Sequence, residues 1–129
     1  MALELAIIAP ALLAVIALIL SYGRYSQVTG LLESAARDGA RAATQSRSLP
    51  EARQRLDAIT ADTLRRAAPS CRDSASDQID SPAFQAGDDV TVTVSCTVSY
   101  SDLGIWGAPG STTVRRSFVS PLDPYRGVG

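Results

Sequence analysis

The chain begins with a long hydrophobic stretch. From Leu5 to Gly23 no residue is charged, and Glu4 and Arg24 bracket the run. As a helix, these 19 residues would extend about 28 Å, close to the roughly 30 Å hydrocarbon core of a bilayer. We therefore expect a membrane span at about residues 5–23. A cleaved signal peptide is the competing interpretation, but its apolar region is usually shorter and ends in a small-residue cleavage site.

The helical pattern continues beyond this stretch. Glu33 and Arg37 are spaced for an i,i+4 ion pair on the polar side. The sequence predicts one nearly continuous helix from about Ala2 to Ser46, about 68 Å long. A domain of this size is too small to cover such a helix alone. Its partner is expected to be the protein's own C-terminal part or further copies of the chain. The apolar stripe recurs at three- and four-residue spacing: Val28, Leu31, Leu32, Ala35, Ala36, Gly39, Ala40 and Ala43.

Two residues of the N-terminal segment have alternative interpretations. Pro10 removes one helical hydrogen bond, which fits either an ordinary kink of a membrane helix or a flexible point for extracting the helix from lipid. Glu4 lies at the edge of the apolar run. Its carboxylate either rests in the headgroup zone or neutralises a positive charge when the helix is buried among other helices, since an unpaired buried charge is very costly.

A second helix is predicted after a short connection. Residues 48–51 (Ser-Leu-Pro-Glu) have the spacing of a capping box, with proline in the first helical turn. The helix should run to about Ala67 and end before Pro69. Residues 70–89 are rich in Ser, Asp, Pro and Gly and are predicted to be loop. The expected inward stripe of the second helix consists of Ala52, Leu56, Ile59, Thr63 and Ala67.

Two strands follow in the C-terminal part. Residues 90–100 alternate strictly between apolar and hydroxyl-bearing side chains, which predicts a strand with one buried face. Residues 112–119 are predicted to pair with it in antiparallel fashion. The connection between the strands carries an apolar tip, Ile105 and Trp106, which either plugs the core or contacts another molecule. The fold class is therefore α+β: residues 1–46 form the helix, and residues 47–129 form a small α+β head with an antiparallel sheet.

The two cysteines predict a disulfide. Cys96 lies on the apolar face of the first strand, and Cys71 follows the second helix. An even pair in a small domain behind a membrane segment indicates one bridge in an oxidising compartment. Two buried free thiols are the alternative.

Composition excludes several kinds of chemistry. The chain has no His and no Lys, so His-based triads, His-metal sites, Schiff bases and the P-loop lysine are impossible. We expect no enzymatic activity, no cofactor and no metal. The net charge of -1 gives no reason to expect nucleic acid. Weaker alternatives are a calcium site among the clustered loop acids and a basic patch; their residues are Asp73, Asp77, Asp80, Asp88 and Asp89 for calcium, and Arg65, Arg66, Arg72, Arg115 and Arg116 for the patch.

The N-terminal third resembles the corresponding region of TadE-like proteins, the pseudopilins of tight-adherence pili, which are similar to type IV pilins. The resemblance rests on Glu4, Pro10, Gly23-Arg24 and the run at residues 35–43 (AARDGARAA), and the closing segment 120–126 (SPLDPYR) is also similar. It implies a prepilin leader and a type IV pilin-like fold. The family places the carboxylate at the fifth mature residue, whereas here it is the fourth, so we expect one further mature residue or processing just before Met1.

The resemblance implies a structural role. Glu4 would meet the N-terminal amine of a neighbouring subunit. The implied partners are copies of the chain, a prepilin peptidase, the pilus-assembly machinery and the inner membrane before assembly. The remaining implied assembly residues are Leu5, Ile8, Pro10, Leu12, Leu13, Ile16 and Leu20.

The expected location is the cytoplasmic membrane, with the C-terminus outside, followed by the extracellular pilus. The arginines after the span would by themselves favour a cytoplasmic C-terminus. The cysteine pair and the polar strand-rich tail favour the reverse, and a basic leader would supply the missing N-terminal charges. Other classes are a minor pilin, a single-span membrane protein with an exported binding or adhesion domain, and, least supported, a membrane-tethered enzyme.

Overall fold

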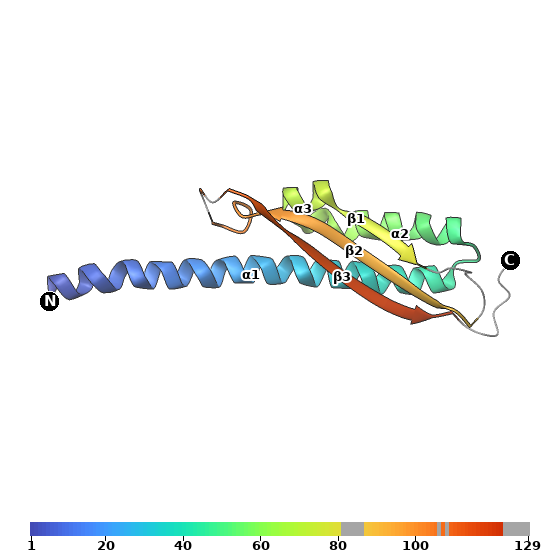
Figure 1. Cartoon of the computed structure of the whole chain (residues 1–129), viewed down its shortest axis with the longest axis horizontal. Coiled ribbons are helices and arrows are strands. Elements are labelled where there is room, and N and C mark those ends of the chain that lie inside the picture. The colour runs from blue at the N-terminus through green and yellow to red at the C-terminus, as the bar shows by residue number, and fades with distance from the viewer. Residues whose placement is uncertain (81–86, 106, 108, 123–129) are drawn as a thin grey trace.

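The computed structural model describes residues 1–80, 87–105, 107 and 109–122. In Figure 1 one half of a long helix projects alone, and the other half packs into a head with a small sheet. The sheet is antiparallel with strand order β1-β2-β3. The predicted α+β class is therefore confirmed. The elements are α1 (Ala2–Gln45), α2 (Leu49–Thr63), the 3-10 turn η1 (Leu64–Arg66), α3 (Pro69–Ser74), β1 (Ser76–Asp80), β2 (Asp89–Ser99) and β3 (Ser111–Pro121).

Helix α1 is continuous, as its sequence pattern predicts, and its second half belongs to the core of the head. The predicted stripe is buried except for Leu31, which is half-buried. Glu33 and Arg37 form the expected ion pair on the opposite side, with 3.1 Å between Oε1 and Nη2. After Leu32 the buried residues of the stripe are all alanine or glycine. Both α2 and the sheet pack against this part of α1. The division of the chain at Ser46 into helix and head stays a prediction.

Gly39 lies where α1 packs tightly against α2. A Cβ atom placed on Gly39 would lie 2.3 Å from Leu56 Cδ1 and 3.5 Å from Val92 Cγ1. Leu56 and Val92 are themselves buried, so neither side chain has free space into which it can move. The absence of a side chain at Gly39 therefore lets the two helices and the sheet meet.

We expect Gly39→Ala to destabilise the head by about 1 kcal/mol. Overpacking a filled core costs roughly 1–3 kcal/mol, and the gain in helix propensity offsets about 1 kcal/mol of that cost. Gly30 is the matched control, because it lies in the same helix and a Cβ there meets nothing within 4 Å. Gly30→Ala should raise the midpoint of denaturant unfolding, whereas Gly39→Ala should lower it. Equal midpoints for the two variants would contradict the packing described here.

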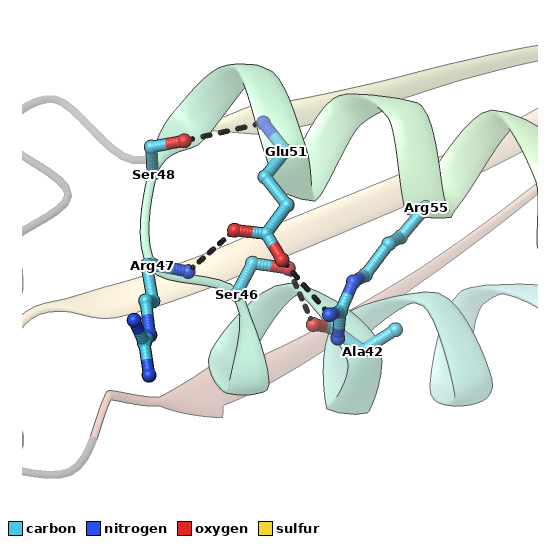
Figure 2. Close-up of polar contacts among 6 residues, drawn as sticks. All are labelled: Ala42, Ser46, Arg47, Ser48, Glu51 and Arg55. Carbon is cyan, nitrogen blue, oxygen red and sulfur yellow. Dashed lines mark hydrogen bonds and ion pairs between the residues drawn. The ribbon is translucent and has the colours of Figure 1, made fainter.

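The turn from α1 to α2 is short because side chains satisfy the ends of both helices (Figure 2). The Ser46 hydroxyl donates to the carbonyl of Ala42 at 2.8 Å, and the Ser48 hydroxyl accepts from the backbone N–H of Glu51 at 3.4 Å. The Glu51 carboxylate accepts from the backbone N–H of Arg47 at 3.2 Å and pairs with Arg55 at 2.8 Å. This is the predicted capping spacing, with the carboxylate reaching one residue further back than in a standard capping box.

The sheet has one apolar face and one hydroxyl-bearing face. Along β2 the predicted alternation is confirmed: Val90, Val92, Val94, Cys96 and Val98 are buried on the helix side. On the other face, hydroxyl pairs join the strands, with oxygen–oxygen distances of 2.8, 3.0 and 3.3 Å. The second predicted strand is also confirmed, as β3 pairs with β2 in antiparallel register. The hydroxyl pairs are Ser76–Ser95, Thr93–Ser117 and Thr97–Thr113.

Three predictions in the middle of the chain were wrong. Helix α2 ends at Thr63, and its buried line runs through Thr60 and Leu64 rather than through Ile59 and Thr63, because the buried positions advance in four-residue steps. The segment predicted to be loop contains both α3 and β1. Pro69 opens α3 instead of only ending the preceding helix, since proline fits the first turn of a helix.

Candidate membrane and assembly helix

The first half of α1 has no contact that buries it. Every residue from Met1 to Leu20 is exposed, and the projecting half of the helix is visible in Figure 1. Its large apolar side chains between Leu3 and Tyr22 are 51–80% exposed. Such a surface is far larger than the apolar patches that soluble monomers tolerate. By length and composition, α1 is able to cross a membrane.

The structure places the predicted assembly residues together on this projecting half. Glu4 lies in the first turn of α1, and Pro10 lies inside the helix, which continues through it. Because proline has no N–H, the carbonyl of Ala6 receives no helical hydrogen bond. The side chains of the predicted assembly residues are not covered by any residue of the head that the structure describes. The other members of the set, Leu5, Ile8, Leu12, Leu13, Ile16 and Leu20, are all exposed.

The head meets α1 just after the hydrophobic stretch. Arg24 Nη1 donates to the backbone carbonyl of Asp102 at 3.3 Å. The Asp102 carboxylate accepts from the hydroxyl and the backbone N–H of Ser70, at 2.5 and 3.1 Å, and Ser70 Oγ accepts from the N–H of Ser99. The two hydrogen bonds from Ser70 lower the pKa of Asp102, with a smaller contribution from the Arg24 charge. The junction thus joins α1, α3 and the β2–β3 connection, which no local sequence signal indicated.

The β2–β3 connection carries the predicted apolar tip. Ile105 is 41% exposed, and Leu103 beside it is buried. Leu103 therefore provides the core contact of this connection, and Ile105 is accessible to another molecule. Trp106, the other residue predicted at the tip, lies outside the described residues.

The predicted bridge between Cys71 and Cys96 is present. It joins α3 to the centre of β2, with a Cα–Cα distance of 4.8 Å, and both residues are buried. Ser74 reinforces the same connection, because its Oγ donates to the carbonyl of Thr97 at 2.9 Å and accepts from the Thr97 N–H at 2.8 Å. The disulfide and Ser74 together hold the short helix α3 against the sheet.

An acidic pair lies between α2 and β1. Burial, the largest cause, and the neighbouring carboxyl of Asp57 raise the pKa of Asp77 to about 6. Within residues 1–80, 87–105, 107 and 109–122, no group of three or more acidic or cysteine side chains is arranged to hold a metal ion.

We expect Asp77→Asn to stabilise the head at pH 7 but not at pH 3. A carboxyl whose folded pKa is raised binds its proton more tightly in the folded state, so stability falls as pH rises from about 3.8 to about 6. After allowance for partial exposure, the gain at pH 7 should be about 1 kcal/mol. Thermal unfolding at both pH values measures it, with Asp73→Asn as a control on α3. A gain that is the same at both pH values would contradict the effect of the acidic pair.

A comparison with protein families finds a match for most of α1. The family model described as TadE-like protein matches residues 1–41. The predicted resemblance is thereby confirmed over this region. The match covers the free half of α1 and most of the stripe in the head, and it ends before α2. No curated protein and no solved structure matches the chain.

The TadE-like match is confined to the N-terminal third of the chain. It agrees with the exposed apolar helix, which is suited to membrane anchoring. The matched region ends at Arg41, two residues before the last buried position of the stripe, Ala43. The matched region therefore includes both the exposed half of α1 and most of the part that packs in the head.

Proposed function

We propose that this chain is a structural subunit of a tight-adherence pilus. In this account the free half of α1 first spans the cytoplasmic membrane, with the head outside. After prepilin processing it packs among the corresponding helices of neighbouring subunits in an extracellular filament. The observation that carries the proposal is the complete exposure of residues 1–20 within the region that matches TadE-like proteins.

The shape of the molecule supports this proposal. The turn between β2 and β3 and helix α3 lie at the end of the head nearest to the free half of α1, whereas the α1–α2 turn lies at the far end (Figure 1). The free half is thus available along its whole circumference. A bundle of such helices would bury the apolar side chains of each copy, and the heads would lie outside the bundle. Copies of the chain, a prepilin peptidase and assembly proteins are the proposed partners.

Substitution of Glu4 should impair assembly without impairing membrane insertion. Its carboxylate adds one charge at the edge of an otherwise apolar surface. In a helix bundle it would pair with the N-terminal amine of a neighbour, and removing one partner of a buried ion pair costs about 3 kcal/mol or more. We therefore expect Glu4→Ala to insert normally into the membrane but to lower the amount recovered in filaments by at least about a hundredfold.

Glu33→Ala provides the matched control. Glu33 is a carboxylate of the same helix, but its side chain is 55% exposed in a surface ion pair with Arg37, and such pairs contribute little to stability. Membrane fractions and sheared filaments should be quantified for both variants. Normal filaments from Glu4→Ala would contradict the proposed role of this carboxylate. Equal losses from both variants would show a general effect of charge removal.

A further inference from the structure

A pocket lies at the level where α1 leaves the head. Its volume is about 670 Å³, within the usual range for small-molecule sites. One wall is formed by α1, and the others come from the segment that joins η1 to α3 and from the β2–β3 connection. The lining combines apolar side chains with two guanidinium groups. The lining includes Arg24, Gln27, Gly30, Leu31, Arg66 and Leu103.

The α1 wall of the pocket begins in the headgroup layer of a membrane and extends outward from it. If the span ends at Gly23, Arg24 and Gln27 lie about 2 and 6 Å beyond the hydrocarbon boundary, at about 1.5 Å per residue. The polar layer on each side of the hydrocarbon core is roughly 5–7 Å thick. The α1 wall of the pocket therefore begins at headgroup depth, provided that α1 is inserted as proposed above.

The β2–β3 connection reaches the same level from the other side of the pocket. A Cβ atom on Gly104 would lie 3.7 Å from Arg24 Nη1 and 3.8 Å from Ser21 Oγ, so this connection touches the last turns of the hydrophobic stretch. Ile105 follows it with an exposed apolar side chain. An apolar side chain next to the end of a span is favourable at a lipid surface, which would hold this end of the head against the bilayer.

The charges at the pocket favour an anionic occupant. Among the described residues Arg66 has no ion pair, whereas its neighbour Arg65 is paired with Asp62 and does not line the pocket. Arg24 keeps three or more donor positions besides the one it gives to the Asp102 carbonyl. Asp102 also lines the pocket, and the Ser70 hydrogen bonds favour its anionic form, so the two arginines leave the lining with a net charge of +1. Two guanidinium groups at one pocket match a phosphodiester.

We propose that this pocket binds the headgroup of an anionic phospholipid while the chain is inserted in the membrane. The phosphate would lie between Arg24 and Arg66, with the acyl chains directed toward the bilayer along the free half of α1 and the outer part of the headgroup directed toward Leu31. The bound lipid would orient the head on the membrane surface before assembly. The proposal rests on the membrane-inserted state of the proposed function, and it adds a ligand class and the residues that recognise it.

The test uses the full chain reconstituted in vesicles of phosphatidylcholine and phosphatidylglycerol in equal parts. After extraction in mild detergent, native mass spectrometry counts the lipids that stay bound. The unmodified chain should retain phosphatidylglycerol about fivefold above phosphatidylcholine, the enrichment expected for one arginine close to a membrane surface. Arg66→Gln should abolish the enrichment. Arg65→Gln removes the same charge one residue away and should leave the enrichment unchanged.

A second variant tests the pocket without changing charge. Gly30 lines the pocket and has open space above its Cα atom, so Gly30→Leu should fill the pocket and exclude the lipid without disturbing α1. Excess inorganic phosphate should not displace the lipid. Displacement by phosphate would show a general anion site and overturn the assignment to lipid. Equal losses from Arg65→Gln and Arg66→Gln, or retention by Gly30→Leu, would also overturn it.

The outcomes separate this proposal from the proposed function. A chain that enters the vesicles and shows no preference for phosphatidylglycerol would refute the lipid pocket, while the pilus role would stand. A chain that fails to enter the vesicles at all would refute both. Thermal unfolding of each variant in the same detergent shows whether its head remains folded.

Discussion

Replacing Cys71 and Cys96 together by serine should destabilise the head by about 3.5 kcal/mol. The bridge closes a loop with a sequence separation of 25 residues, and the chain-entropy model gives this value for its effect on the unfolded state. For a domain of this size, the melting temperature should fall by roughly 15–25 °C. Differential scanning calorimetry of the full chain in detergent measures the change.

The size of the effect follows from the small core. The buried side chains are mostly alanine and valine, with few large ones, so burial contributes less than in a domain of larger residues. Reductant is the matched control: it should lower the melting temperature of the unmodified chain and leave that of the double serine variant unchanged. An equal melting temperature for both chains without reductant would contradict a stabilising role for the bridge.

Deleting residues 1–23 should release the head from the membrane and leave its fold intact. Residues 1–20 contribute no buried side chain, so the core from Val28 onward loses nothing. The exposed leucine, isoleucine and valine side chains of the deleted segment together favour the membrane by roughly 5 kcal/mol. Vesicle flotation should therefore change from nearly complete binding to none, and the melting temperature should shift by less than a few degrees.

A shorter deletion provides the control for this experiment. Removing residues 1–4 takes away Glu4 but keeps the uncharged run from Leu5 to Gly23, so flotation should be retained. Loss of the head's folding in the longer deletion would show that the free half of α1 stabilises the head. Retained flotation after the longer deletion would show that the head itself binds the membrane.

Periodic segments of the sequence predicted their structures well. The long apolar run and the stripe after Val28 specify α1, because its burial follows from one regular spacing. Strand β2 was predictable for the same reason, since each of its inward residues is apolar and each outward one is polar. The cysteine pair could be placed because Cys96 shares the inward side of that strand.

The missed elements depend on contacts that are distant in sequence. Strand β1 has the sequence Ser-Asp-Gln-Ile-Asp, in which Ile79 is the one apolar residue, and it becomes a strand by pairing with β2. Helix α3 is short and polar, and the disulfide and Ser74 hold it in place. The junction of Arg24 with Asp102 joins residues 78 positions apart, so no local pattern could reveal it. The pocket beside it was missed for the same reason.

Sheared extracellular filaments test most directly the proposal that the free half of α1 is an assembly surface. Cells that produce the chain should be sheared, and the filaments should be collected by centrifugation and probed for the head with a specific antibody. We expect the chain to be recovered in the filaments, and the chain lacking residues 1–23 to be absent from them. Recovery of the unmodified chain solely in the membrane fraction would contradict the claim and favour a membrane-anchored binding protein.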